Sequence, residues 1–113
     1  PPPAAFSNPQ EGKSMIIITG HMKIAAAKMA AARTLMRAMV EATRQEPGCL
    51  LYRFAEDALE PGTIALTERW ESAEALAEHG KTAHMAAWRA GIGEIGVLER
   101  DLWAHEASAG RKL

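Results

Sequence analysis

Two alternating runs in the middle of the chain, separated by a turn, constrain the possible folds more than any other feature. Apolar side chains recur at alternate positions in residues 49–55 and again in residues 64–70. Residues 57–62 between them include acidic residues, proline and glycine, which favour a turn. The two runs therefore predict an antiparallel hairpin. One face of its second strand carries Ile64, Leu66, Glu68 and Trp70.

The segments before the hairpin predict a strand and then a helix. The β-branched run in residues 15–22 favours a strand that is apolar on both faces. Residues 25–45 contain good helix formers, with apolar residues at helical spacing on one side and charged residues on the other. Pro47 disfavours helical geometry in the residue before it, and Gly48 permits a reversal, so the helix is predicted to end here.

After the hairpin the pattern predicts an interrupted helix and a last strand. Ser72 is a suitable N-cap for a short helix that ends near His79, and Gly80 separates it from a second helical piece over residues 82–90. Three glycines, at positions 91, 93 and 96, predict a loose connection to a fourth strand over residues 97–105.

The element order β-α-β-β-α-β predicts an α+β domain of the ferredoxin-like type, with an antiparallel sheet and helices on one of its faces. The first strand is apolar on both sides, so the uncovered face is expected to lose exposed area to a second copy of the sheet. We therefore predict a homodimer.

Length and charge limit the remaining possibilities. With 113 residues the chain is expected to form one domain over residues 15–107, between a flexible extension (residues 1–14) and a short tail (residues 108–113). The chain has thirteen basic and fourteen acidic residues and no basic cluster, which argues against nucleic acid as a partner. No apolar run is long enough for a membrane helix, and no signal pattern is seen. The single cysteine, Cys49, is compatible with a reducing compartment. We therefore expect a cytoplasmic protein without a membrane partner.

Two histidines, His79 and His84, invite a metal-site hypothesis. On a continuous helix their five-residue spacing gives a rotation of about 140°, whereas the zinc-binding helix motif uses a spacing of four. A helix break at Gly80 would bring them together, but no Cys, Asp or Glu is expected to complete a tight cluster, and no metal is predicted. His84 and Trp88, four residues apart, share a helical face and either line a pocket or simply pack.

Glu68 lies among apolar residues on its strand face, where an unpaired carboxylate is costly. It is expected to have a partner, such as a histidine or arginine, or a raised pKa; alternatively it reaches solvent at the strand end. Tyr52 either donates a hydrogen bond to a ligand or packs with its hydroxyl satisfied by backbone. Two isolated histidines near strand ends, His21 and His105, are more often exposed or dimer-facing residues than catalysts; of the two, His21 is the better substrate-binding candidate.

The stretch from Glu46 to His84 resembles the signature of the antibiotic biosynthesis monooxygenase (ABM) superfamily. With the flanking strand and helix, the resemblance covers residues 15–106. The matching residues are Glu46-Pro47-Gly48-Cys49 leading into Tyr52, the Glu68-Arg69-Trp70 strand end, and Ser72, Leu76, His79 and His84 in the following helical segment.

This resemblance implies a homodimeric α+β barrel that oxygenates a small phenolic, quinol or anthrone-like aromatic substrate with dioxygen, without flavin, metal or nicotinamide. The sequence agrees, since it contains no Gly-rich dinucleotide motif, P-loop or nucleophile elbow. The resemblance also implies roles for particular residues. His84 or His79 would accept a proton, Glu68 would orient that histidine, Tyr52 would donate a hydrogen bond, and Trp70 and Trp88 would form aromatic walls.

Other activities hosted by the same fold remain alternatives. The haem-degrading branch of the superfamily is disfavoured, because Gly20 replaces its first-strand Asn, His79 stands at its Trp position and Arg89 at its haem-ligand position. Isomerisation of a small hydroxyketone would use the same base without oxygen, although no phosphate cradle is evident. A non-catalytic ligand-binding dimer is the third possibility, and a pocket without converging polar groups would favour it.

Overall fold

The computed structural model describes residues 14–113; the extension predicted for residues 1–14 therefore lies outside the described residues except for Ser14. The element order matches the predicted one, with one additional short 3₁₀ helix. The elements are β1 (Met15–Lys23), η2 (Ala26–Lys28), α1 (Met29–Thr43), β2 (Cys49–Glu56), β3 (Thr63–Trp70), α2 (Ala73–His79), α3 (Ala83–Ile95) and β4 (Glu99–Ala107).

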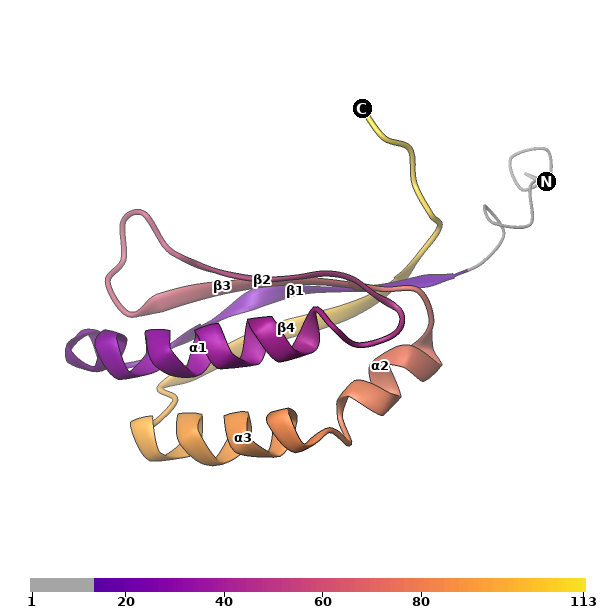
Figure 1. Cartoon of the computed structure of the whole chain (residues 1–113). Helices are drawn as coiled ribbons and strands as arrows, with labels where there is room; N and C mark the ends of the chain where they lie inside the picture. The colour runs from indigo at the N-terminus through magenta and orange to yellow at the C-terminus, as the bar shows by residue number, and fades with distance from the viewer. Residues whose placement is uncertain (1–13) are drawn as a thin grey trace, which may run out of the picture.

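The four strands form one antiparallel sheet in the order β2-β3-β1-β4. Because directly paired residues of neighbouring strands point to the same side, the pairs Ile18–Glu68 and Tyr52–Glu68 place all three side chains on one face. The helices lie on that side of the sheet, and the other side is left uncovered (Figure 1). The ferredoxin-like β-α-β-β-α-β prediction is confirmed.

The buried core lies between the sheet and the helices. Trp70, Ile64 and Met22 from the strands are essentially inaccessible to solvent, and Met39 of α1 packs against the same cluster. The polar side of α1 is exposed, as its charge pattern predicts. Helix α3 packs closely on α1 at Gly91, where an added Cβ would lie 2.7 Å from Leu35 Cδ2.

Two predicted boundaries are corrected by the structure. The glycines at 91 and 93 do not form a loose connection but lie within α3, which continues to Ile95 and ends at Gly96 with φ of +92°. Tertiary packing explains the difference, since Trp88 and Ile92 are buried on one face of α3 and stabilise the helix despite its glycines. Strand β4 accordingly begins and ends two residues later than predicted.

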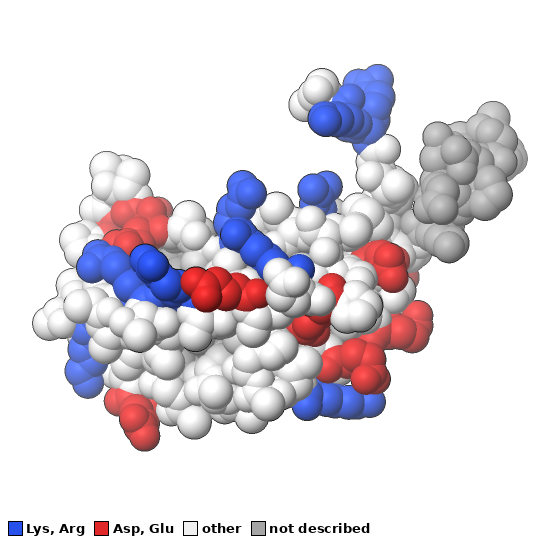
Figure 2. All heavy atoms as spheres, viewed as in Figure 1, with Lys and Arg blue, Asp and Glu red and all other residues white. Residues whose placement is uncertain are grey.

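The surface carries both signs of charge. On the face seen in Figure 2, Lys and Arg atoms lie beside Asp and Glu atoms in a row across the molecule. Oppositely charged side chains also form hydrogen bonds on the surface; Arg33, for example, donates two to Glu56, at 2.8 and 2.9 Å. Within residues 14–113, no helix combines the length and the apolar character that crossing a membrane would require.

Candidate active site

A cavity of about 750 Å³ lies on the helix-covered side of the sheet, between the strands and α2 and α3. Two neighbouring cross-strand rows of side chains form its floor. The first row is Tyr52, Glu68, Ile18 and Ala104, and the second contains Phe54, Leu66 and Leu102. This volume is within the range of small-molecule sites, and most of the lining is apolar.

Aromatic side chains form one wall of the cavity. Phe54 of β2 and Trp88 of α3 stack with ring centroids 5.1 Å apart and planes inclined by 28°. Tyr52 meets Phe54 edge to face, with centroids 5.5 Å apart. Flat apolar faces of this kind bind aromatic rings well, because they combine a large buried area with offset stacking.

Glu68 is the acidic group of the cavity floor. Its side chain is buried, and Oε1 accepts a 2.8 Å hydrogen bond from Trp70 Nε1. Burial raises the pKa of the Glu68 carboxyl above its ordinary value, and the bond from Trp70 partly offsets this effect. The sequence-based expectation of a partner or a raised pKa is confirmed, but the partner is the indole of Trp70.

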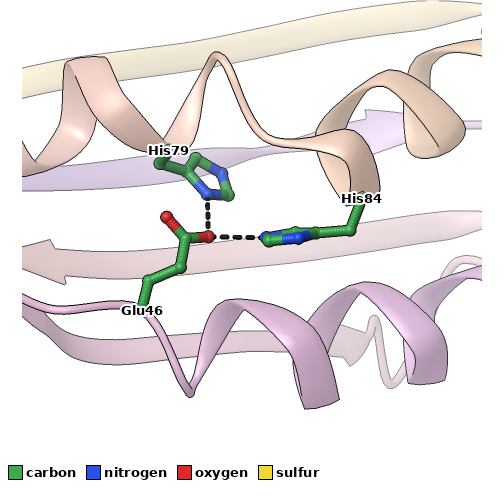
Figure 3. A group of neighbouring side chains, drawn as sticks. All are labelled: Glu46, His79 and His84. Atoms are coloured by element: carbon green, nitrogen blue, oxygen red, sulfur yellow. Dashed lines mark hydrogen bonds and ion pairs between the residues drawn. The ribbon is translucent and has the colours of Figure 1, made fainter.

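A second carboxylate joins the two histidines. Glu46 Oε2 lies 2.7 Å from His79 Nδ1 and 2.6 Å from His84 Nε2 (Figure 3). The three side chains converge from the α1–β2 turn, the end of α2 and the start of α3. Only 4% of the His79 side chain and 11% of the Glu46 side chain are exposed, so these charge-assisted bonds are largely shielded from water.

Local sequence explains why these elements meet. Helix α2 begins at its predicted cap, Ser72, whose hydroxyl accepts from Ala75 N. Helix α2 ends at His79, and Thr82 then caps α3 while its hydroxyl donates to His79 O at 2.8 Å. On the other side of the cluster, Gly48 has φ of +83°, and an added Cβ would lie 2.6 Å from Ala75 Cβ. A glycine is therefore required where the turn passes α2.

The cluster defines the free nitrogen of His79. With Glu46 as the common acceptor, both histidines donate, so His79 donates from Nδ1 and keeps the lone pair of Nε2 for a ligand. The His79 ring packs against Trp70 with centroids 4.8 Å apart, and against Tyr52 at 5.6 Å. His79 lines the cavity, so this arrangement can hold a neutral imidazole base at its wall.

Glu46, His79 and His84 are also the residues, within the described chain, that could hold a cation, because their ligand atoms lie within 4.8 Å of one another. Two ligands of a tetrahedral metal at 2.0–2.1 Å lie about 3.3 Å apart. The observed separations of 2.6 and 2.7 Å are instead those of hydrogen bonds. The donor types fit a metal, but the side chains as placed satisfy one another.

The sequence profile described as "Antibiotic biosynthesis monooxygenase" matches residues 15–91. The chain belongs to the antibiotic biosynthesis monooxygenase family.

Relatives of this ABM protein support the same assignment. It is 42% identical over 65 residues to the protein named "Putative monooxygenase Rv0793" of Mycobacterium tuberculosis, covering 58% of this chain and 63% of that one. It is 29% identical over 84 residues to "Uncharacterized protein sll1783" of Synechocystis, covering 74% of this chain and 57% of that one. The aligned part therefore spans less than two thirds of either relative.

Solved structures match the ABM domain over most of its length. The structure of Rv0793 superposes with a TM-score of 0.69 at 30% identity, over 88% of this chain and 98% of that one. A crystal structure described as a "putative antibiotic biosynthesis monooxygenase" from Caulobacter crescentus gives a TM-score of 0.75 at 25% identity, over 88% and 92% of the two chains.

The ABM fold brings some of the predicted site residues together and separates others. Those that line the cavity are Tyr52, Glu68, His79 and Trp88. Trp70 is fully buried behind His79 and does not line the cavity, and His84 contacts Glu46 from outside the lining. His21 lies away from the cavity lining, where its Nε2 is 2.5 Å from Glu99 Oε2.

Two sequence-based expectations about this ABM site are corrected. An acidic residue does complete a cluster with His79 and His84, because the α1–β2 turn carries Glu46 to them from 33 and 38 positions away. Glu68, predicted to orient a histidine, is hydrogen-bonded to Trp70, and Glu46 holds both imidazoles instead. Glu46 belongs to the Glu-Pro-Gly signature on which the family resemblance rests, so the sequence marked this residue. The resemblance gave no role for its side chain.

Proposed function

We propose that this ABM-family protein is a cofactor-independent monooxygenase that oxidises a small phenolic, quinol or anthrone-like aromatic substrate with dioxygen. One observation carries the proposal: a histidine in the cavity wall, His79, is held through Nδ1 by Glu46, which leaves Nε2 as a proton acceptor. Oxygenation without a cofactor requires such a base, because the substrate must become an electron-rich anion before it reacts with dioxygen.

The reaction can be written for an anthrone-like substrate in its phenolic form. His79 removes the hydroxyl proton, and the anion gives one electron to dioxygen. The substrate radical and superoxide combine into a peroxide at the ring carbon, which then takes a proton. Loss of water from this hydroperoxide leaves a quinone. One oxygen atom of dioxygen thus remains in the product, the other leaves as water, and the proton taken by the base is returned.

Other residues of the cavity support this chemistry. Glu46 is the positioning residue, since it sets the tautomer and orientation of the His79 ring. Phe54 and Trp88 offer stacked faces for an aromatic ring, and Tyr52 supplies a hydroxyl at the floor. The convergence of Tyr52, Glu68 and His79 in one cavity favours an enzyme over a passive binding protein.

We also propose that two copies associate through the uncovered face of the sheet. On that face Ile17 and Leu51 both pair with Arg69 across neighbouring strands, and both are only partly buried. A second sheet would cover them. Sedimentation equilibrium would support this if it gave about twice the chain mass of 12.2 kDa.

As part of the same proposal we place the protein in the cytoplasm, where the thiol of Cys49 stays reduced.

The test is oxygen consumption by chelator-treated protein with a panel of hydroquinones and anthrones. We expect uptake by the wild-type protein and a loss of roughly 100-fold in His79→Gln, which is the low end for removal of a general base. Glu41→Gln, at an exposed position of α1 away from the cavity and the uncovered sheet face, is the control and is expected to retain wild-type uptake. Full uptake by folded His79→Gln, or none by the wild-type protein on any substrate, contradicts the proposal.

A further inference from the structure

The cavity has an uneven distribution of charge that the proposed chemistry does not use. Its lining contains two arginines, Arg89 and Arg100, and a single carboxylate, Glu68. Both arginine side chains are exposed, whereas Glu68 is buried in the floor. The exposed rim of the cavity therefore carries the two arginines, and its interior is mostly apolar and aromatic around Tyr52, Glu68 and His79.

Arg89 is anchored near the proposed base. It lies on α3, and its Nη2 donates a 3.1 Å hydrogen bond to Gly80 O, immediately after the helix end that carries His79. This single bond occupies one of the five N–H groups of the guanidinium. The remaining donors of Arg89 are free to meet a ligand.

Arg100 lies near the start of β4. In the sheet it pairs with Met22, a buried residue that also lines the cavity, so the two side chains leave the sheet on the same side. Within residues 14–113, the Arg100 side chain makes no hydrogen bond or ion pair that meets ordinary distance criteria. Its guanidinium donors are therefore available to a ligand in the cavity.

We propose that the ligand of this cavity is an aromatic carboxylate: a flat ring system bound against Phe54 and Trp88, with an ionised carboxylate held at the mouth by Arg89 and Arg100. The inference rests on the proposed function for the reacting ring and adds the acidic group. Two guanidinium groups on the lining select an anion, because guanidinium forms charge-assisted bonds with a carboxylate. A neutral arene of the same shape can fill the interior but leaves both cations without a partner.

A matched pair of ligands tests the proposal without turnover. The probes 2-naphthoate and 2-naphthamide have nearly the same shape and differ in charge, and neither carries a hydroxyl to be oxidised. Calorimetric titration of the full chain is expected to show naphthoate binding about tenfold more tightly than naphthamide at low salt, with the difference shrinking as salt is added. Arg100→Gln and Arg89→Gln are each expected to weaken naphthoate binding several-fold and to leave naphthamide binding within twofold.

A control variant separates a local effect from a change in total charge. Arg37 lies in a different groove, between α1 and β2, together with Arg33, Arg44 and Arg53. Arg37→Gln removes one positive charge, as the other variants do, and is expected to bind both probes like the wild-type protein. Equal affinities for the two probes, no detectable binding of either, or an equal loss in Arg37→Gln would each overturn the proposal.

The outcomes also separate this inference from the proposed function. A preference for naphthoate that needs Arg89 and Arg100, in a protein that consumes no oxygen with any phenol, would retain the ligand class and remove the monooxygenase. The opposite result is oxygen uptake that is lost in His79→Gln but does not depend on a carboxylate on the substrate or on either arginine. It would retain the monooxygenase and remove the carboxylate ligand class.

Discussion

Two carboxylates, those of Glu46 and Glu68, lie beside the same aromatic cluster but have different surroundings. Glu46 receives two imidazole N–H bonds at one oxygen, whereas buried Glu68 receives one bond, from an indole. The first joins two histidines and can orient a base. The second is held where burial opposes its ionised form. The comparison teaches that two carboxylates beside one aromatic cluster can have different roles: one joins two histidines, and the other is a buried group whose pKa is raised.

The largest expected effect comes from removing the Glu46 carboxylate. Glu46→Ala leaves the imidazoles of His79 and His84 without their acceptor, and we expect a loss of about 3 kcal/mol in the free energy of unfolding, since bonds to charged groups contribute about 1.5–3 kcal/mol each. Oxygen uptake is expected to fall about tenfold or more, as for other residues that orient a functional histidine. Urea denaturation and oxygen uptake measure the two effects; a wild-type unfolding midpoint would contradict the anchoring role.

The next largest effect is expected from removing the indole N–H that donates to Glu68. Trp70→Phe keeps a ring in the core but deletes the N–H that bonds to Glu68. We expect a loss of about 2 kcal/mol near pH 8, from the missing bond and the lost volume. The loss should be smaller near pH 4, because a protonated Glu68 needs that donor less. Urea unfolding at the two pH values measures this, and a loss independent of pH would mean that only volume matters.

Glu68→Gln should stabilise the protein at high pH. The folded-state pKa of Glu68 is raised above its ordinary value of 4.5, so between these two values the folded protein binds more protons than the unfolded chain. The wild type therefore loses stability as pH rises from 4.5 through the folded pKa, and the variant lacks this loss. We expect a gain of about 1 kcal/mol above that window, in line with the cost of a buried polar group without a full set of partners. Thermal unfolding from pH 4 to pH 9 measures it; a gain larger at pH 4 would give the wrong sign.

The smallest effect is expected for His84→Gln. His84 bonds to Glu46 from outside the cavity lining, and a quarter of its side chain is exposed. A glutamine amide can still donate to Glu46, so we expect less than 1 kcal/mol of lost stability. Oxygen uptake should stay within about threefold of the wild-type rate, because a conservative change outside the cavity removes no group that meets the substrate. A loss as large as that of His79→Gln would assign the base to His84 instead.

Much of the fold follows from local patterns that the sequence displays. The hairpin of β2 and β3, the cap at Ser72 and the helix break at Gly80 each rest on a short-range rule, and all three are present in the structure. The end of α3 is different, because its glycines favour a loop locally while burial of Ile92 favours the helix. Packing prevails there, and the prediction of a loose connection is wrong.

The site divides along the same line. Alternation along β2 and β3 was enough to place Tyr52 and Glu68 on the face that became the cavity floor. The helical period placed His84 beside Trp88 but could not tell which histidine faces the cavity. That depends on how α2 and α3 are tilted after the break, and the angle between two short helices is not determined by either one's own sequence.

The sequence by itself determined the order of elements, the apolar face of the third strand and the family, because these depend on periodicities of two and 3.6 residues and on a short signature. Only the tertiary structure decided that Glu46 meets His79 and His84, that Trp70 is the partner of Glu68, and that Arg89 and Arg100 line one cavity. Such contacts join segments far apart in the chain. They depend on strand register and helix packing, which emerge only when the sheet and helices bury their apolar faces together.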